Sequence, residues 1–383
     1  MNMTNWVMNR EVLVGENTLL QLPSSLGWYG CKKVFLAVYS KDADCVKQVC
    51  SLLDENGTSF VVYDKIIKEP NLQVIDEGTV LCISEACDCV VAIGGGSVID
   101  ASKMIAMMAA NGGTTENYQL DGKTVEKQPL LFIAVPTTAG TGSEATRVSV
   151  IFNEKKGYKK AAYDNSMIAQ LAILDPVTTL GLPPAVTAAT GMDAITHAIE
   201  TYTSLNANEF SRMYSLKGLK LLVDNIVTAY NEPDNLTARE GMLLGSYFAG
   251  CALAVGTCLA HIVGQPLGAI YNIPHGDACS IFLFPSMRMN KDYCLDKYVD
   301  IASTLGVDPK GKSQDDMFEE GIAILQDIAR KVNAPTKITQ YVDATTVDID
   351  FAVNNVATSM AHIKHNPRPV SPEVFRELIS AAM

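Results

Sequence analysis

Short apolar runs alternate with helical stretches through the first half of the chain. The segments between these runs, such as 44–57 and 98–111, carry apolar residues at helical spacing. The alternation predicts βαβ units and therefore a parallel sheet. Four of the runs have the length and composition of buried parallel strands: 33–38 (KVFLAV), 59–64 (SFVVYD), 89–97 (CVVAIGGGS) and 129–136 (PLLFIAVP).

The second half of the chain has a different pattern. After residues 172–184 (AILDPVTTLGLPP) the strand signals nearly vanish, and helical stretches rich in alanine, leucine and isoleucine run to the end. No repeat, low-complexity tract or flexible linker separates the halves. We therefore expect an α/β domain over residues 1–181 and an all-helical domain over residues 182–383, packed tightly with a cleft between them.

Composition argues against several classes of protein. With 383 residues, 48% of them hydrophobic, the chain can bury a large core. A formal net charge of -12 argues against extended nucleic-acid contacts, which need clustered lysine and arginine. No apolar run reaches the roughly 18 to 20 residues that span a bilayer, and residues 1–15 lack the pattern of a secretory signal. We expect a cytoplasmic protein that acts on small molecules, without nucleic-acid or membrane partners.

The ten cysteines are scattered along the sequence. A chain of this length needs no disulfide framework, so we expect most of them to be small buried apolar residues. Cys87 and Cys89 are separated by one residue and have no second pair at zinc-site spacing. We assign no metal to this pair.

A glycine turn follows the third predicted strand, in the segment VVAIGGGSVIDASK. Backbone without side chains lets N–H groups approach an anion, and the start of the following helix favours negative charge. The spacing is neither G-x-G-x-x-G nor the P-loop, so a plain tight turn stays open as the alternative. The cofactor-binding candidates in this segment are Gly94, Gly95, Gly96, Ser97 and Asp100.

A second loop, PTTAGTGSEAT (136–146), follows the fourth predicted strand. Its hydroxyl and amide groups, including Ser143, suit the same ligand. Two such loops at the carboxyl ends of strands in one parallel sheet favour a nucleotide over two unrelated turns.

An aspartate and a histidine lie four residues apart in GMDAITHAIE (191–200). Residues at this spacing share one face of a helix, so Asp193 and His197 can point at a common atom. The chain has only five histidines, and two of the other four in the helical half are His261 and His275. One carboxylate and three imidazoles suit a divalent ion such as iron or zinc. The alternative is an ordinary helix-surface pair with His261 as a hydrogen-bonded core residue.

Four segments together resemble the iron-dependent (group III) alcohol dehydrogenases. They are IGGGSVID, PTTAGTGSEATR, GMDAITHAIETYTS and LAHIVGQPLGAIYNIPHG, and they match in order over most of the chain. The resemblance implies a Rossmann-like nucleotide-binding domain followed by a helical domain, which is the dehydroquinate synthase-like architecture. It further implies a metal ion, a nicotinamide cofactor and a homodimer.

The resemblance also assigns roles to single residues. It places the metal ligands at Asp193, His197, His261 and His275, with Fe(II) as the expected ion and Zn(II) as the alternative. Pyrophosphate contacts fall on Gly95, Gly96 and Ser97, and other cofactor contacts on Thr137, Thr138, Thr141 and Asn71. The implied reaction interconverts a short-chain aldehyde and its primary alcohol, because a bound metal lowers the pKa of the alcohol and the carbon of the resulting alkoxide can then release hydride to nicotinamide.

Two positions depart from the family pattern. Gln265 stands where many members have a further histidine. It is a candidate for orienting substrate or water but cannot itself titrate, and a simple spacing role is the alternative. After the first predicted strand the chain has Tyr39 and Ser40 where NAD-preferring members often have an aspartate. Lys41 is the one nearby cation for a 2′-phosphate, so we expect NAD as the cofactor, with NADP as the alternative.

A basic cluster near the C-terminus, MAHIKHNPRP (360–369), stands out in an acidic chain. We hypothesise that His362 or Lys364, with Arg147, meets an anionic tail on the aldehyde, such as the sulfonate of sulfoacetaldehyde, a phosphonate or a carboxylate. Ala252 would leave room for this tail, and His362 is also a candidate for proton relay. The alternative is a solvated basic loop.

Two other functions remain open from the sequence. One is a non-redox enzyme of the dehydroquinate synthase type, which also binds NAD and a divalent metal. The other is a catalytically silent nucleotide-binding protein.

Overall fold

The computed structural model describes residues 5–67, 69–360 and 364–383. The chain divides into two compact units, each described here by itself. The first contains residues 1–138 and 142–180, and the second contains residues 139–141 and 181–383.

The first unit is an α/β domain. Its strands are β1 (Glu11–Val14), β2 (Lys33–Val38), β3 (Ser59–Tyr63), β4 (Cys89–Gly94), β5 (Leu131–Pro136), β6 (Val148–Asn153), β7 (Tyr158–Tyr163) and β8 (Leu171–Leu174). Its helices are α1 (Leu22–Tyr29), α2 (Asp44–Glu55), α3 (Leu72–Ser84), α4 (Gly96–Asn111) and α5 (Thr115–Gln119).

Six strands form one parallel sheet in the order β1-β8-β5-β4-β2-β3. The chain runs outward from β2 to β3 and then crosses back to β4 on the other side of β2. The carboxyl ends of β2 and β4 are therefore neighbours at a change of direction, with Val38 paired to Ile93. Ligands of open α/β sheets bind at such a point.

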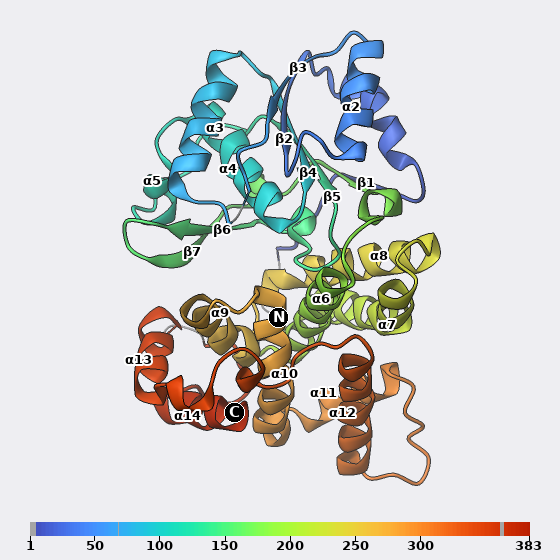
Figure 1. Ribbon diagram of the computed structural model, residues 1–383, viewed down its shortest axis with the longest axis vertical. Helices are drawn as coiled ribbons and strands as arrows, with labels where there is room; N and C mark the ends of the chain where they lie inside the picture. Colours follow the sequence, from blue (N-terminus) through green and yellow to red (C-terminus); the bar gives the residue numbers. More distant parts are fainter. Residues whose placement is uncertain (1–4, 68, 361–363) are drawn as a thin grey trace. The chain divides into compact units, whose positions relative to one another are not determined.

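Alternating side chains of the strands face opposite sides of this sheet. In β4, Val90 and Ala92 pack into one buried cluster, whereas Val91 and Ile93 pack into another. The first cluster includes residues of α3 and α4, and the second includes residues of α1 and α2. Helices thus cover both faces, as Figure 1 shows, which explains why the central strands are apolar throughout.

The predicted fold class is confirmed, and all four strands predicted from the sequence are present as β2, β3, β4 and β5. The structure adds β1 and β8, which pair with each other at one end of the sheet. It also adds an antiparallel hairpin of β6 and β7 that forms a separate two-stranded sheet.

Within the described part of the chain, the regular elements of the second unit are all helices. They are α6 (Pro184–Thr203), α7 (Glu209–Asn231), α8 (Leu236–Ala252), α9 (Leu259–Tyr271), α10 (His275–Asn290), α11 (Leu295–Thr304), α12 (Gln314–Lys331), α13 (Ile349–Met360) and α14 (Pro372–Ala381), with short 3-10 turns between some of them.

Two buried clusters hold these helices together. One joins α6, α7 and α8 to α11 and α12, and the other joins α9 and α10 to α13 and α14. Figure 1 shows α13 and α14, in red, side by side near the C-terminus. Among the described residues no single helix is long and apolar enough to cross a membrane, although the bent pair 236–255 and 259–271 reaches that length and composition.

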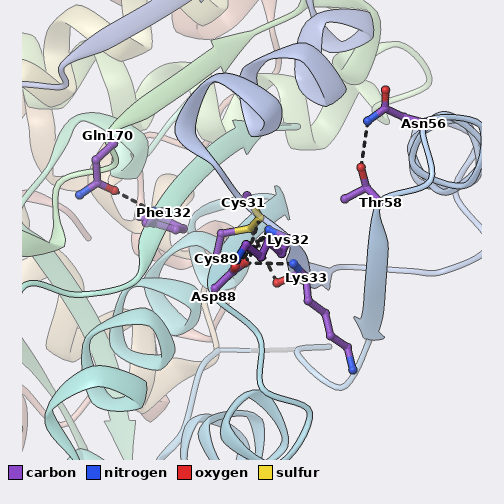
Figure 2. Close-up of a disulfide and its surroundings, with 9 residues drawn as sticks. All are labelled: Cys31, Lys32, Lys33, Asn56, Thr58, Asp88, Cys89, Phe132 and Gln170. Atoms are coloured by element: carbon purple, nitrogen blue, oxygen red, sulfur yellow. Dashed lines mark hydrogen bonds between the residues drawn. A yellow bond between two sulfur atoms is a disulfide. The ribbon is translucent and has the colours of Figure 1, made fainter.

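The cysteines differ in part from the expectation. Six of them are buried and take no part in a disulfide, namely Cys82, Cys87, Cys251, Cys258, Cys279 and Cys294. Cys31 and Cys89, however, form a disulfide between the start of β4 and the residues just before β2 (Figure 2). The two residues are 58 positions apart in sequence and become neighbours only because β2 and β4 pair, so no local pattern marks them.

Candidate active site

The helix α6 carries the first two predicted metal ligands. Every residue of this helix from Gly191 to Thr203 is buried, so its polar side chains there face the protein interior. Asp193 and His197 lie one helical turn apart, with Oδ1 of the aspartate 3.8 Å from Nε2 of the histidine. The four-residue spacing thus brings both side chains to one point, as the sequence predicts.

The helices α9 and α10 supply the other two. α9 ends at Tyr271, and Asn272 then adopts the left-handed conformation (φ 54°) that turns the chain. Pro274 precedes α10, whose first residue is His275. Nε2 of His261 lies 3.4 Å, and Nε2 of His275 lies 3.6 Å, from the same Oδ1 of Asp193. The structure therefore gathers all four predicted ligands around one carboxylate oxygen.

A glycine allows α10 to approach α6 this closely. A Cβ atom on Gly276 would lie 2.1 Å from the backbone oxygen of Ala189, a distance that no real side chain tolerates. Gly276 directly follows His275, so the lack of a side chain there lets the His275 ring reach Asp193.

Buried polar atoms in this cluster have no hydrogen-bond partner among the described residues. They are Oδ1 of Asp193, Nε2 of His261 and Nδ1 of His197. Buried polar groups are normally satisfied, and each exception calls for an explanation. A divalent cation between the carboxylate and the imidazoles would satisfy Asp193 Oδ1 and His261 Nε2 together, and oxygen and nitrogen donors of this kind suit iron or zinc.

The charges in the cluster favour the same conclusion. Burial by itself raises the pKa of Asp193, but the neighbouring imidazoles outweigh this effect and hold that pKa well below its usual range. Burial lowers the pKa of His197, and the charge of Asp193 offsets this only in part. Asp193 is thus an anion and His197 a neutral ring, which are the forms that bind metal ions.

Glu200 is a functional candidate that the sequence analysis missed. It is buried two turns after Asp193 on α6, and its Oε2 lies 2.7 Å from Nδ1 of His261. Its carboxylate also accepts the backbone N–H groups of Cys258 and Ala260 at the start of α9, at 2.9 and 2.6 Å. The position seven residues after Asp193, on the same face of the helix, could have marked it.

Cys279 is a second residue that the sequence analysis missed. It lies one turn after His275 on α10 and is fully buried, and its Sγ is 3.8 Å from Nε2 of His275. Burial raises the pKa of the Cys279 thiol to about 12, so the thiol is neutral when no cation is present. The i, i+4 spacing from His275 was the available signal.

The glycine turn lies at the carboxyl end of β4. Gly94 is the last residue of the strand, Gly95 is the N-cap of α4, and a Cβ on Gly94 would lie 2.6 Å from Val98. The first turn of a helix leaves backbone N–H groups without intrahelical partners. Gly96 and Ser97 are the first two residues of this sixteen-residue helix, so the turn has the features of an anion site.

The loop after β5 supplies the second set of predicted cofactor residues. Thr137 and Thr138 belong to the first unit, and Thr138 Oγ1 would lie 3.2 Å from a Cβ on Gly95. Thr141 belongs to the second unit, with the neighbouring Gly140 against Thr190 of α6. The structure therefore places Thr137 and Thr138, but not Thr141, in the unit that contains the glycine turn.

Asp100 and Ser143 take part in a buried network. Ser143 donates a hydrogen bond to Asp100, and the buried Lys103 ammonium donates to Ser143 at 2.7 Å and to Thr146 at 2.9 Å. Asp100 also accepts the backbone N–H of Val150 at 2.8 Å. These contacts link α4 to the loop after β5 and to the β6–β7 hairpin.

The remaining candidates lie outside these clusters. Asn71 caps α3 by accepting the N–H of Val74, and Gln265 is half-buried on α9 one turn after His261. Arg147 is exposed and donates to Asn165, whereas Ala252 is fully buried at the end of α8. Lys364 is exposed, and His362 lies outside the described residues.

The residues after Lys364 hold the start of α9. Asn366 is buried and accepts the backbone N–H of Leu259 at 3.1 Å. Its side chain also exchanges two hydrogen bonds with that of Asn290 on α10. His365 Nε2 lies 2.6 Å from the backbone oxygen of Thr257. This part of the basic C-terminal segment is therefore built into the framework of the second unit.

Comparison with known proteins places the whole chain in one group. The family model for iron-containing alcohol dehydrogenase matches residues 9–176, and the model for the C-terminal part of the Fe-containing alcohol dehydrogenase family matches residues 187–383. The chain is 31% identical to the lactaldehyde reductase of Escherichia coli (strain K12) over 384 residues, which covers 98% of each chain.

Two solved structures share the complete fold. One is 1,3-propanediol oxidoreductase, with a TM-score of 0.94, 28% identity and full coverage of both chains. The other is the sulfoacetaldehyde reductase of Bifidobacterium kashiwanohense in complex with NAD+, with a TM-score of 0.89, 26% identity and coverage of 100% of this chain and 99% of that one. The comparisons support iron and NAD as the cofactors. The resemblance found in the sequence motifs is confirmed, and the chain belongs to the iron-containing alcohol dehydrogenase family.

Proposed function

We propose that the protein is an iron-dependent, NAD-linked alcohol dehydrogenase that reduces a short-chain aldehyde to its primary alcohol and catalyses the reverse reaction. Residues 1–181 would bind the nucleotide, and residues 182–383 the metal and the substrate. The observation that carries the proposal is the buried Oδ1 of Asp193, which has no hydrogen-bond partner in the described part of the chain and which three imidazoles face at 3.4 to 3.8 Å. Membership of the alcohol dehydrogenase family supports the same reaction.

Asp193, His197, His261 and His275 would hold a divalent ion, which would supply Lewis-acid chemistry toward an aldehyde carbonyl or an alcohol oxygen. A bound nicotinamide would supply or accept the hydride, and the substrate oxygen would exchange one proton with water. The backbone N–H groups of the glycine turn at Gly94–Ser97 would hold the pyrophosphate of that cofactor. Gln265 cannot titrate, so its amide orients substrate or water rather than carrying the proton.

The test is NADH oxidation by metal-depleted protein reconstituted separately with Fe(II) and Zn(II), using a set of short aldehydes. We expect turnover only after metal is restored, and none from Asp193→Ala at the same metal concentration. An Asp224→Ala variant, in which an exposed aspartate of α7 is removed, is the matched control and keeps full activity. Turnover that survives exhaustive chelation would contradict the proposal.

The cofactor is NAD rather than NADP in this proposal. Lys41, the cation that follows β2, lies 3.8 Å from the carboxylate of Asp64. An acidic group beside that lysine disfavours the additional phosphate of NADP, because like charges repel. The expected result is a higher kcat/KM with NADH than with NADPH, and a smaller difference between the two in Asp64→Asn.

We further propose an aldehyde with an anionic tail as the substrate, bound through Lys364. The exposed lysine directly precedes His365 and Asn366, whose side chains contact the start of α9. The likeness to a sulfoacetaldehyde reductase supports this substrate class. We expect Lys364→Ala to lower kcat/KM for sulfoacetaldehyde more than for propionaldehyde, whereas Lys310→Ala, at another exposed lysine, changes neither. Equal losses for both aldehydes would contradict it.

The protein is also expected to be a homodimer. Light scattering of the purified chain tests this part of the proposal directly, and a monomer would contradict it.

A further inference from the structure

A thiol lies beside the predicted metal ligands. Cys279 is fully buried on α10, one helical turn after His275, and its Sγ is 3.8 Å from Nε2 of that histidine. The candidate ligand atoms of Cys279, Asp193, His261 and His275 all lie within 4.8 Å of one another. The thiol therefore belongs to the same cluster of donors.

These separations fit donors that share one cation. Nitrogen and oxygen ligands bind zinc-like ions at about 2.1 Å and sulfur at about 2.3 Å, which places adjacent ligand atoms about 3.0 to 3.6 Å apart. Nε2 of His261 and of His275 lie 3.4 and 3.6 Å from Oδ1 of Asp193, and the thiol lies 3.8 Å from His275. Small side-chain shifts would bring all four donors to one ion.

Two of the atoms in this group are buried without a hydrogen-bond partner among the described residues, namely Oδ1 of Asp193 and Nε2 of His261. A cation between the two atoms would satisfy both of them. A cysteine that served only to fill space would not need to point its sulfur toward them.

We propose that Cys279 is a further protein ligand of the metal centre, an inference that rests on the proposed function. The metal–sulfur bond forms as the thiol proton leaves to bulk water, with no change of oxidation state. Together with Asp193, His197, His261 and His275 it would offer the ion five protein donors. A thiolate adds a soft ligand, which favours iron or zinc over magnesium and manganese.

Cobalt(II) is the probe for this proposal, because cobalt bound by a thiolate gives an intense near-ultraviolet charge-transfer band that cobalt bound only by nitrogen and oxygen lacks. Metal-depleted full-length protein is titrated with Co(II) while the Cys31–Cys89 disulfide is intact, so that those sulfurs cannot bind cobalt as thiolates. The variants are Cys279→Ser and the matched control Cys294→Ser. Cys294 is also buried in the second unit, and its thiol donates to the backbone oxygen of Asn290 at 3.4 Å, a bond that serine can keep.

The proposal predicts the charge-transfer band in the wild-type protein and in Cys294→Ser, and its loss in Cys279→Ser. The dissociation constant for Co(II) should rise roughly tenfold or more in Cys279→Ser, since even outer partners of a metal site contribute ten- to hundredfold. Wild-type protein that binds one equivalent of Co(II) with visible d–d bands but no charge-transfer band would overturn the role of Cys279 and leave the metal site standing. Equal Co(II) binding by wild-type protein and Asp193→Ala would instead overturn the metal site itself.

Discussion

Glu200 and His261 form a buried pair in which Oε2 of the carboxylate lies 2.7 Å from Nδ1 of the ring. The ring donates its Nδ1 hydrogen to this carboxylate, so Nε2 is the ring nitrogen that faces Asp193, at 3.4 Å. The same carboxylate accepts two backbone N–H groups at the start of α9. One side chain therefore fixes the tautomer of a predicted ligand, the direction of its ring and the helix that carries it.

Replacing Glu200 by glutamine should weaken metal binding. The amide keeps the shape of the side chain but has only one acceptor oxygen, so at least one of the three N–H donors then faces an NH2 group. Partners of metal-binding histidines contribute ten- to hundredfold to metal affinity, and we expect a loss of roughly that size in Glu200→Gln. Competition with a chelator of known affinity measures it.

Glu209→Gln is the matched control, because Glu209 is an exposed glutamate at the start of α7. Its metal affinity should equal that of the wild-type protein. Unchanged affinity in Glu200→Gln would show that the pair holds the helices together without orienting a ligand.

Replacing Gly95 by alanine should weaken nucleotide binding. The backbone of Gly95 is extended, with φ -75°, so alanine fits the local conformation. Its Cβ would nevertheless lie 3.2 Å from Thr138 Oγ1, on the turn where the pyrophosphate is expected. We expect the Kd for NADH to rise roughly tenfold, or about 1.4 kcal/mol, with metal affinity unchanged.

NADH fluorescence measures this change. Gly27→Ala in α1 is the control, since a Cβ there meets no atom within 4 Å. If Gly95→Ala binds NADH as tightly as Gly27→Ala, the glycine turn is not the pyrophosphate site.

The central strands of the first unit could be predicted because each is a continuous apolar run between turns. β2 begins and ends where the sequence predicts, at Lys33 and Val38. β1 and β8 have only four residues each, and they pair across about 160 positions, Glu11 with Leu171. Four apolar residues carry no period that separates a strand from a helical turn, so only the tertiary pairing defines them.

In the site, too, residues with a local sequence pattern could be predicted, and a residue that depends on tertiary packing could not. Asp193 and His197 could be predicted because their spacing is local, and the few histidines of the chain indicated His261 and His275, which the family resemblance also implied. In the sequence, Glu200 cannot be told from an ordinary helical glutamate, because its partners on α9 become neighbours only in the fold. The role of a buried polar residue such as this one depends on which helix packs against it, and a single sequence does not reveal that packing.

Reduction of the Cys31–Cys89 disulfide should destabilise the first unit. The bond closes a loop of 58 residues, and constraint of the unfolded chain by a loop of this length corresponds to on the order of 4 kcal/mol. Both tryptophans of the chain, Trp6 and Trp28, lie in the first unit, so their fluorescence follows its unfolding in urea. We expect a reductant to lower the free energy of unfolding of the wild-type protein by roughly this amount.

The variant Cys31→Ser should behave like the reduced protein and show no further response to reductant. Cys50→Ser, which removes a half-buried free thiol, should respond like the wild-type protein. If the reductant lowered the free energy of unfolding of Cys31→Ser as much as that of the wild-type protein, the disulfide would not be the cause of the loss.

Glu144 should make the stability of the first unit depend on pH. Burial raises the pKa of this carboxyl to about 7 from an ordinary value of 4.5, and the nearby charge of Lys103 reverses only part of the effect. Between these two values the folded state binds a proton that the unfolded state has lost. The contribution of Glu144 to the free energy of unfolding is therefore fully present below about pH 4.5 and is lost as the pH rises to about 7. The expected loss is about 3 kcal/mol, because one pKa unit corresponds to about 1.4 kcal/mol.

The effect of Glu144 is isolated by comparing Glu144→Gln with the wild-type protein. The free energy of unfolding of each is measured in urea, with tryptophan fluorescence as the signal. Glutamine stays neutral at every pH, so the variant should gain stability relative to the wild-type protein between about pH 5 and pH 8. Glu126→Gln, at an exposed glutamate of the same unit, should show no such gain. A constant difference between Glu144→Gln and the wild-type protein across this range would mean that Glu144 is already ionised at pH 5 in the folded protein, and that Lys103 compensates its burial fully.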